Sequence, residues 1–494
     1  MVAMVVNIMQ QILYMEGFSM KKAIRLIIVI ITIGIALAVC DHVLLLKSKD
    51  GIEQIHSYYL QKENTVDVLF LGSSHVYCNI NTGTIWDEYG ISSFDLGGAE
   101  QPYWNSYYYL KEALKTQKPK VIVFEITTPG IRETDFQPEN WLICNTYGMH
   151  WSENRIEAIK SSSVEQSFER LLNPFNSIHN RYKDLSEEDF VDSERDISNK
   201  GFDPRETVVP FERPDITQIT ETEPISEKAE LYLNKIIDYA EQENIPLLLL
   251  TAPYTVKDEA QKRYNYVFQI ADSRQIPYLD SNKMYDEIGL DFATDMADDL
   301  HLNRAGNEKF SKFLGKYLLD RYEIADHRGD IKYASWEEDA LKQRMSQAEF
   351  ILHGTYDLNS YLPQINHENY VSMVFLGNNF TDTVTDEGIL TQLKNCGFTD
   401  ETLGNGQALF SGGRDVLFQS NAEEFKWSQD VKEHNLLCSR EKNEYGDIST
   451  TVFVDEQKYT IGLNGITVLI YDQVQNKIVD YVNFDAQNGF AAFR

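Results

Sequence analysis

A glycine, two serines and a histidine follow directly after an apolar run in the segment DVLFLGSSHVY, residues 67–77. The run is apolar on both faces, which is typical of a buried parallel strand. Because Gly72 has no Cβ to obstruct a sharp turn, the hydroxyl of Ser74 would be exposed at the carboxyl end of this strand, where parallel sheets bind ligands. The turn therefore indicates a serine nucleophile, although a similar turn is common in nucleotide-binding sheets.

A serine hydroxyl is a weak nucleophile, and it needs a base within hydrogen-bond reach that is oriented by a third group. The segment DMADDLHLNRAG, residues 295–306, offers such a pair. Asp298 stands three residues before His301, so one turn of backbone can carry both the base and its orienting acid. Alone, the pair also fits a helix N-terminus with a solvent-exposed histidine. Together with Ser74, it predicts a Ser–His–Asp triad.

Short apolar runs alternate with helical patterns after about residue 50. The apolar runs predict buried parallel strands at residues 67–71, 120–126, 245–250 and 276–280. The helical patterns predict helices at residues 105–117, 225–244, 259–275 and 303–322. Such alternation produces crossover connections, with helices on both faces of one sheet. The predicted fold class is therefore α/β, a three-layer α/β/α arrangement with a parallel sheet.

The chain of 494 residues is too long for one ordinary domain, so we expect two globular units. An N-terminal segment, residues 1–50, precedes the α/β domain, which we place at residues 51–335. A polar stretch at about residues 140–220 breaks the alternation and predicts an insertion. Further on, β-rich segments at 370–377, 450–455, 465–472 and 477–485 surround a helical pattern at 386–397. They predict a C-terminal α+β accessory domain at residues 345–494.

The N-terminal segment carries a basic cluster and then an almost unbroken apolar stretch. Lys21, Lys22 and Arg25 precede residues 26–46, and roughly 20 apolar residues suffice to cross a bilayer. The excess of positive charge before the stretch predicts a cytoplasmic N-terminus and an extracytoplasmic body. We therefore expect a single-pass transmembrane helix that anchors the protein in the cell membrane. A cleaved signal peptide is the alternative, but no small-x-small site follows the stretch.

The composition excludes several classes of function. The formal charge of −31 argues against a general nucleic-acid binder, because phosphates would be repelled. The five cysteines are widely scattered and form no pair or His/Cys cluster at zinc spacing. We expect no metal and no organic cofactor, which agrees with the chemistry of a serine nucleophile.

Four segments in a fixed order carry a resemblance to a known family. FLGSSH, FDLGGAEQ, KVIVFE and DDLHLNRAG together resemble the blocks of the SGNH (GDSL-like) hydrolases, over roughly residues 65–322. The match is most similar to the membrane-anchored cell-surface branch, which includes D-alanyl-lipoteichoic acid transfer and alginate O-acetylation proteins. The resemblance implies a flavodoxin-like sheet with Ser74 as nucleophile, His301 as base and Asp298 as its partner.

The resemblance also implies an oxyanion hole and substrate contacts. Backbone N–H groups of Gly97 or Gly98, together with that of Ser74, would stabilise the negative oxygen of the intermediate. The asparagine of the family's third block is absent, since that strand ends in Glu125. Either Gln101 supplies the missing donor or the oxyanion hole is weaker. His179 and Arg181 lie in the predicted insertion. They resemble a His-x-Arg stretch of the same surface branch, and substrate contact and a structural salt link are both open for them.

These observations lead to one functional hypothesis and two alternatives. We expect a membrane-anchored serine esterase or O-acyltransferase that acts on cell-envelope or exopolysaccharide glycans through an acyl-serine intermediate. A membrane-bound acyl donor is an expected partner. The first alternative is an SGNH-shaped glycan-binding or scaffold protein without turnover, which the missing asparagine favours. The second is a carboxylesterase for small soluble esters.

The C-terminal part has a resemblance of its own. The segments GLNGITVLIYDQVQNKIVDYVNFD and YVSMVFLGNNFTDTVTDEGILTQLKNCGF resemble the interleukin-like EMT inducer domain, over about residues 350–494. This resemblance implies an accessory domain that binds carbohydrate or protein, and it assigns no catalytic residue.

Overall fold

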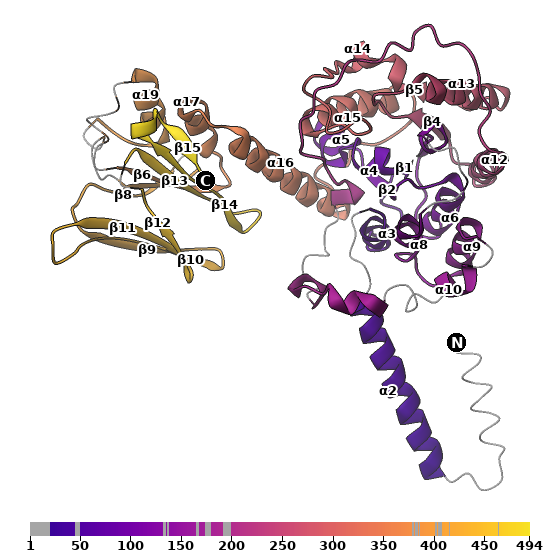
Figure 1. Cartoon of the computed structure of the whole chain (residues 1–494), viewed down its shortest axis with the longest axis horizontal. Helices are drawn as coiled ribbons and strands as arrows, with labels where there is room; N and C mark the ends of the chain where they lie inside the picture. The colour runs from indigo at the N-terminus through magenta and orange to yellow at the C-terminus, as the bar shows by residue number, and fades with distance from the viewer. Residues whose placement is uncertain are drawn as a thin grey trace. The chain divides into compact units, whose positions relative to one another are not determined.

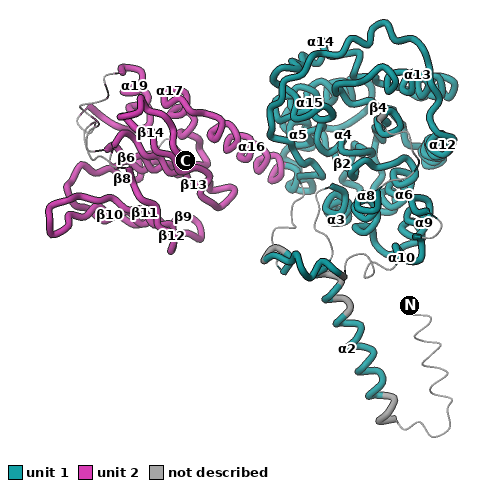
Figure 2. The backbone as a smooth tube through the Cα atoms, in the orientation of Figure 1, with its two compact units in different colours: residues 1–336 teal, residues 337–494 magenta. Residues whose placement is uncertain are grey.

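The computed structural model divides the chain into two compact units, residues 1–336 and 337–494 (Figure 2). The structure describes residues 20–44, 50–131, 135, 138–164, 167–172, 179–190, 199–377, 380, 384, 386–400, 403, 408–413, 415–462 and 464–494. Each unit has its own sheet system and its own hydrophobic core.

The first unit is built around a five-stranded parallel sheet with the order β2-β1-β3-β4-β5 (Figure 1). The strands are β1 (Val68–Gly72), β2 (Ser93–Gly97), β3 (Val121–Glu125), β4 (Leu247–Thr251) and β5 (Tyr278–Asp280). The first four are buried along their whole length, which explains why their sequences are nearly continuous apolar runs. The predicted α/β class and parallel sheet are confirmed. Strand β2 was not predicted.

Helices cover both faces of this sheet. On one face, α5 (Thr82–Tyr89) packs against α15 (Arg304–Leu319), and both join a core with alternate residues of β1 and β3. On the other face, α6 (Tyr103–Ala113) packs between the sheet and α12 (Glu227–Gln242). Helix α13 (Asp258–Ser273) connects β4 to β5. The strand order reverses direction around β1, so the carboxyl ends of β1 and β3 form the place where such sheets bind ligands.

The predicted insertion consists mainly of short helices. They are α8 (Glu139–Thr146), α9 (Glu153–Ser162), α10 (Phe168–Leu172) and the 3-10 helices η1 (His179–Lys183), η2 (Glu187–Phe190) and η3 (Asn199–Gly201). Helix α9 packs on α6, and Trp104 of α6 donates its indole N–H to Ser162 Oγ at 3.0 Å. Tyr103 and Trp104 are buried, so these rings belong to the core.

The apolar N-terminal segment forms a long helix, α2 (Met20–Leu44). In the part of the chain that the structure describes, no helix meets the combined length and apolarity required to span a bilayer. Residues 45 and 46 of the expected anchor lie outside the described residues. The transmembrane anchor therefore stays a prediction.

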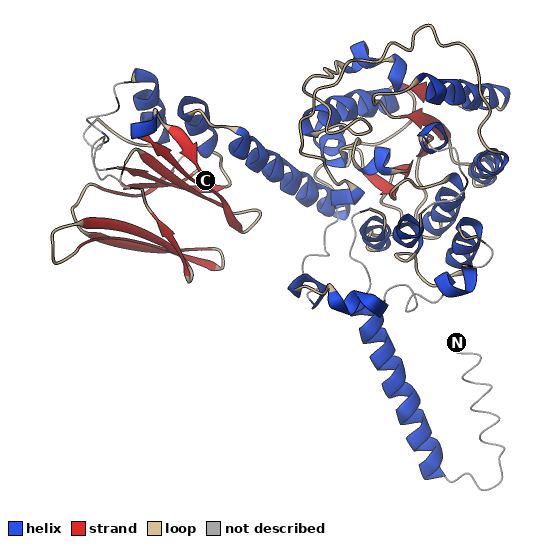
Figure 3. Ribbon diagram, viewed as in Figure 1, coloured by secondary structure: helices blue, strands red, loops and turns tan. Residues whose placement is uncertain are grey.

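The second unit is an antiparallel β structure with helices on one side (Figure 3). A six-stranded sheet has the order β15-β14-β13-β6-β7-β8, and a four-stranded sheet has the order β12-β11-β10-β9. The strands are β6 (Tyr370–Leu376), β7 (Ala408–Gly412), β8 (Asp415–Ser420), β9 (Phe425–Val431), β10 (His434–Lys442), β11 (Ile448–Val454), β12 (Gln457–Thr460), β13 (Ile466–Asp472), β14 (Lys477–Asp485) and β15 (Ala491–Phe493). This part matches the predicted C-terminal domain of strands and helices.

Two cores hold the second unit together. One core lies between the two sheets, where Phe410 stacks on Trp427 with ring centroids 4.5 Å apart. The other core joins the opposite face of the six-stranded sheet to three helices, namely α16 (Ala334–Gly354), α17 (Leu358–Tyr361) and α19 (Glu387–Cys396). Sheets packed face to face in this way bury alternate side chains of each strand.

Candidate active site

The turn after β1 presents Ser74 at the carboxyl end of the sheet. Strand β1 ends at Gly72, and Ser73 caps the short helix α4 (Ser74–Tyr77) by accepting a hydrogen bond from the His75 N–H. A Cβ on residue 72 would lie 2.7 Å from the Glu125 Cβ and 3.0 Å from a Val76 methyl group. Only glycine fits at this close approach, which is the physical reason for the Gly-Ser-Ser sequence.

The structure brings the three residues of the predicted triad together. The Nε2 atom of His301 lies 2.8 Å from the Oγ atom of Ser74. On the other side of the ring, Nδ1 of His301 lies 3.0 Å from both carboxylate oxygens of Asp298. The hydroxyl, the imidazole and the carboxylate thus form a continuous chain of hydrogen bonds, which is the arrangement that activates a serine.

The loop before α15 is held in a fixed shape by its own polar groups. Oδ1 of Asp298 accepts the backbone N–H groups of Leu300 and His301 at 2.8 Å and 2.9 Å. Asn79 is buried and follows shortly after α4. Its Oδ1 accepts a hydrogen bond from the Leu302 N–H at 3.0 Å. Asn79 thereby ties the segment of Ser74 to the segment of His301. Nothing in the local sequence marks Asn79, so its role was not predicted.

The lowered pKa of Asp298 suits its role as the ionised partner of His301. Partial burial acts to raise the pKa of Asp298, but the hydrogen bond and charge of His301 outweigh it and lower that pKa to about 2. The carboxylate is therefore ionised at neutral pH and holds a proton on Nδ1 of His301. The Nε2 atom then carries the lone pair that faces the Ser74 hydroxyl.

A second carboxylate, Glu125, lies behind the nucleophile turn at the end of β3. Its Oε2 accepts the Ser73 hydroxyl at 3.0 Å, and its Oε1 accepts the Thr127 N–H at 2.7 Å and also the Thr127 hydroxyl. Burial raises the pKa of Glu125, and the hydrogen bonds from Thr127 and Ser73 oppose that effect. Sequence analysis noted Glu125 only as a departure from the family pattern, whereas the structure shows it anchoring Ser73, the neighbour of Ser74.

His75 lines the inner side of the site and is not a second base. Its side chain is fully buried, 5.3 Å from His301 between ring centroids, and its Nδ1 lies 3.4 Å from the Ser73 Oγ. Burial, followed by the charge of His301, holds the pKa of His75 well below its usual range. The ring of His75 is therefore neutral.

The predicted oxyanion donors are arranged differently from the expectation. The N–H of Gly98 donates to the Gly72 carbonyl at 3.3 Å, so it does not point at a reacting oxygen. Gly97 allows a close approach, since a Cβ there would lie 2.8 Å from the Ser73 carbonyl. The side-chain amide of Gln101 donates to Ser106 at 3.0 Å, which occupies one of its two N–H groups, so its role as the replacement donor stays a prediction. Among the residues described, the Ser74 N–H has no acceptor, so it is available as a donor.

An asparagine from outside the predicted blocks lies beside this loop. Asn145 of α8 is fully buried and donates to the carbonyl of Ala99 at 2.8 Å. A Cβ on residue 98 would lie 2.1 Å from the Asn145 Oδ1, so this contact requires glycine at position 98. The insertion thus supplies a polar group to the second block, a contact that no sequence signal indicated.

Of the two insertion residues, the structure describes the side-chain contacts of Arg181. Arg181 forms an ion pair with Asp189 at 2.6 Å and also donates to the Val43 carbonyl at 3.3 Å. Of the two roles left open for Arg181, the structure shows the salt link. The side chain of His179 lies outside the described residues. Within the described part of the chain, no group of three His, Cys, Asp or Glu side chains is placed to hold a metal.

Comparisons with known proteins reveal structural neighbours only. No family model matches the chain, and no curated protein matches it. Several solved structures are similar to it, two of which follow. A protein described as lipolytic and of the G-D-S-L family, from Desulfitobacterium hafniense DCB-2, is 11% identical with a TM-score of 0.28, and the match covers 51% of this chain and 99% of that protein.

The second neighbour is a protein described as an acylhydrolase, from Bacteroides fragilis NCTC 9343. It is 11% identical with a TM-score of 0.27, and the match covers 54% of this chain and 94% of that protein. The assignment of function below therefore rests on the geometry of the site.

Proposed function

We propose that the first unit is an SGNH-type serine esterase that works through an acyl-Ser74 intermediate. The observation that carries the proposal is the hydrogen-bonded chain from Ser74 through His301 to Asp298 at the carboxyl end of a parallel sheet. Ser74 and His301 are 227 positions apart in the chain, so it is the fold that brings the hydroxyl into contact with the imidazole.

The chemistry follows from the positions of the protons. Nε2 of His301 takes the Ser74 proton as Oγ attacks the ester carbonyl, and the new C–O bond moves the carbonyl electron pair onto oxygen. When this intermediate collapses, His301 returns the proton to the departing alkoxide, which leaves as an alcohol. Water, or a hydroxyl of an acceptor, then gives its proton to His301 and attacks the acyl-serine carbonyl. Collapse of this second intermediate breaks the bond to Ser74 Oγ, His301 returns the proton to that oxygen, and the carboxylic acid or the new ester leaves. Asp298 stabilises the imidazolium in both halves of the reaction.

The finer proposal concerns the substrate and the site of action. We infer that the acyl group belongs to a cell-envelope or exopolysaccharide glycan, and that transfer to a glycan hydroxyl competes with hydrolysis. Support comes from the order of the sequence blocks and from the basic and apolar segment at the N-terminus, which we propose anchors the protein with its body outside the cell. A membrane-bound acyl donor is the partner that a transferase of this kind would need.

One observation favours a second candidate, a glycan-binding scaffold without turnover. The N–H of Gly98 donates to the Gly72 carbonyl and one N–H of Gln101 donates to Ser106, so the oxyanion hole has fewer free donors than predicted. Removing a single oxyanion donor typically slows a serine hydrolase about 10²–10³-fold. Weak turnover on generic esters is therefore expected even for the esterase.

The experiment is a turnover assay on the purified full chain. An acetylated glycan and a chromogenic acetate are offered with and without an acceptor glycan, and released acetate and acylated acceptor are both measured. The esterase proposal requires Ser74-dependent release of acetate that Ser74→Ala abolishes, whereas Ser273→Ala at the exposed end of α13 changes nothing. Acylated acceptor identifies a transferase. Release that survives Ser74→Ala overturns the proposal.

A further inference from the structure

The base loop, residues 296–302, carries both Asp298 and His301. Met296 and Leu302 pair as an antiparallel bridge where the loop begins and ends. The side chain of Asp298 is 48% exposed, so close packing around it does not fix the carboxylate. The distance between the carboxylate and the imidazole therefore depends on the groups that hold the backbone of the loop.

A strap from the predicted insertion, residues 203–211, lies along the base loop. The Val209 N–H donates to the Met296 carbonyl at 2.9 Å. At its start, the Asp203 N–H donates to the Tyr77 carbonyl at 2.7 Å, in the short helix α4 whose first residue is the nucleophile. The strap thus joins the helix of the nucleophile to the loop of the base.

Two threonine hydroxyls hold the base loop on either side of Asp298. Thr207, in the strap, donates its hydroxyl to the Ala297 carbonyl at 2.9 Å. Thr255, in the loop after β4, donates its hydroxyl to the Asp299 carbonyl. Ala297 and Asp299 are the two neighbours of Asp298 in the chain. Among the residues described, neither hydroxyl bonds to a side chain of the triad, so each acts on the triad through the backbone.

The hydrogen bonds of Asp298 are sensitive to small movements of its backbone. Its carboxylate oxygens both lie 3.0 Å from Nδ1 of His301, and Oδ1 also accepts the Leu300 and His301 N–H groups. A rotation of the peptide group between Ala297 and Asp298 would turn the carboxylate away from the ring. Misplacing a catalytic group by about 1 Å can slow a reaction about 10²-fold, even when the cause lies outside the site.

We propose that Thr207 and Thr255 are positioning residues that hold Asp298 within hydrogen-bond distance of His301. Their two hydrogen bonds form a threonine clamp, through which the insertion contributes to the catalytic geometry. Neither threonine takes part in bond making, so neither is a catalytic residue. The proposal rests on the proposed esterase for its effect on rate, but the geometry that it describes can be measured without turnover.

Valine variants of the two threonines test the clamp, because valine keeps the shape of threonine and lacks the hydroxyl. Stopped-flow reaction of the full chain with a fluorophosphonate measures the rate of Ser74 acylation. We expect Thr207→Val and Thr255→Val each to lower the maximal rate about tenfold, with the half-saturating concentration of the probe unchanged. Thr207→Ser and Thr255→Ser keep the hydroxyl and should stay close to the wild-type rate.

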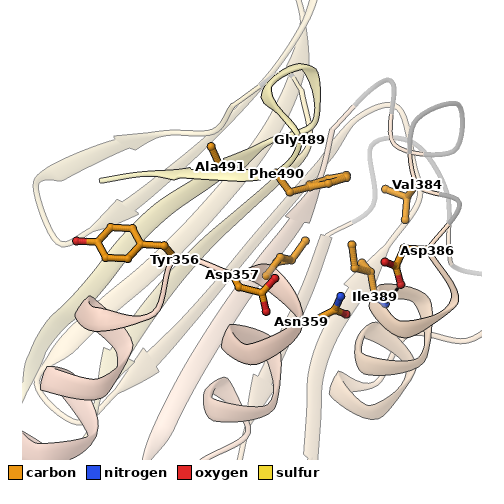
Figure 4. A pocket seen from close by; sticks show the side chains of 10 residues that line it. Tyr356, Asp357, Asn359, Val384, Asp386, Ile389, Gly489, Phe490 and Ala491 are labelled. Atoms are coloured by element: carbon orange, nitrogen blue, oxygen red, sulfur yellow. Dashed lines mark hydrogen bonds between the residues drawn. The ribbon is translucent and has the colours of Figure 1, made fainter. Parts of the chain in front are cut away.

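Two matched controls remove the same kind of hydrogen bond elsewhere. Thr65 precedes β1 in the first unit and donates to the Lys62 carbonyl at 2.6 Å. Thr391 donates to the Glu387 carbonyl at 2.7 Å in α19, the helix whose Ile389 lines a hollow of the second unit (Figure 4). Thr65→Val and Thr391→Val should leave the acylation rate unchanged, and thermal melting of every variant measures the accompanying loss of stability.

A double-mutant cycle shows whether the threonines act through Asp298. In the Asp298→Asn background the hydrogen-bonded pair is already disabled, so each valine substitution should slow acylation much less than it does in the wild type. A contribution to overall structure alone would slow both backgrounds by the same factor, and that result would overturn the proposal. Serine variants as slow as the valine variants would also overturn it, because the hydroxyl would then not be the group that matters.

The proton between Nδ1 of His301 and Asp298 gives a readout that does not need turnover. Proton NMR of the full chain should resolve it at low field in the wild type, and its loss in Asp298→Asn identifies the resonance. We expect exchange with water to broaden this resonance in Thr207→Val and Thr255→Val, and to leave it sharp in both control variants. Such broadening with an unlabelled wild type would defeat the esterase and support the clamp. A resonance that is absent from the wild type, or equally sharp in all threonine variants, would overturn the clamp.

Discussion

Nε2 of His301 lies 2.8 Å from the Oγ of Ser74, although 227 positions separate the two residues in the chain. The distance is that of a good hydrogen bond, with the hydroxyl as donor when Nδ1 holds the imidazole proton. The relationship depends on two structural facts. Strand β1 and the loop before α15 end at the same edge of the sheet, and Asn79 joins their backbones.

Replacing Asp298 with asparagine should disable the base without unfolding the protein. The asparagine amide cannot stabilise an imidazolium, and it favours the wrong tautomer of His301. We expect the rate of Ser74 acylation to fall about 10²–10⁴-fold with little change in substrate KM. Stopped-flow acylation and thermal melting measure the two effects. Asp299→Asn, one position along the same loop, is the control and should acylate at nearly the wild-type rate.

The low pKa of Asp298 predicts a pH dependence of stability. The folded pKa of about 2 lies below the unfolded value of about 3.9, so the carboxylate adds stability above pH 4 that is lost as pH falls toward 2. Because the Asp298 side chain is 48% exposed, solvent screens this interaction. We therefore expect it to add only about 1 kcal/mol to the free energy of unfolding, less than the pKa difference alone would imply. Urea unfolding at pH 6 and pH 3 measures this. The difference in unfolding free energy between wild type and Asp298→Asn should shrink at pH 3, and a constant difference would contradict it.

Glu125 should act as a positioning residue through Ser73. In Glu125→Gln one carboxylate oxygen becomes an NH2 group, which cannot accept a hydrogen bond from Ser73 or Thr127. The turn that presents Ser74 therefore loses one of its hydrogen bonds. We expect about tenfold slower acylation with KM unchanged. Ser73→Ala should behave similarly, and Ser73→Thr, which keeps the hydroxyl, should restore the rate.

Glu112 provides the control for that experiment. It is also a buried carboxylate with several hydrogen bonds, including Ser152 and Asn154 at 2.7 Å each, but it lies on α6. Glu112→Gln should lower stability without slowing acylation. If both glutamine variants slowed acylation in proportion to their loss of stability, the role of Glu125 would be structural only.

Gly72→Ala should destabilise the first unit. The new methyl group would lie 2.7 Å from the Glu125 Cβ, and forcing β1 and β3 apart typically costs about 1–3 kcal/mol. Urea unfolding measures the change. Gly354→Ala at the end of α16 is the control, because nothing lies within 4 Å of a Cβ there and its effect should be near zero.

The parallel sheet and the triad could be predicted because each has a local signature. Fully buried strands read as apolar runs, and Asp298 and His301 share one short segment. Strand β2 was missed because Ser93 and Asp95 interrupt its apolar pattern, although both side chains are buried. In the second unit, half-buried and exposed residues alternate along most of β9. Such alternation indicates a strand, but β9 was not predicted.

The supporting residues could not be predicted, because their roles arise only in three dimensions. Asn79 and Glu125 act on segments far from them in the chain, and Asn145 approaches Gly98 from the insertion. The directions of the expected oxyanion donors also could not be predicted. Gly98 and Gln101 lie in the predicted loop, but the fold directs their N–H groups to Gly72 and Ser106.

The most direct test of the central claim is the mass of the full chain after reaction with a fluorophosphonate, followed by peptide mapping. The account predicts one covalent adduct on Ser74, which His301→Ala and Ser74→Ala both prevent while Ser73→Thr does not. An unmodified chain, or an adduct on another serine with Ser74 untouched, would contradict the account and leave the first unit without a working nucleophile.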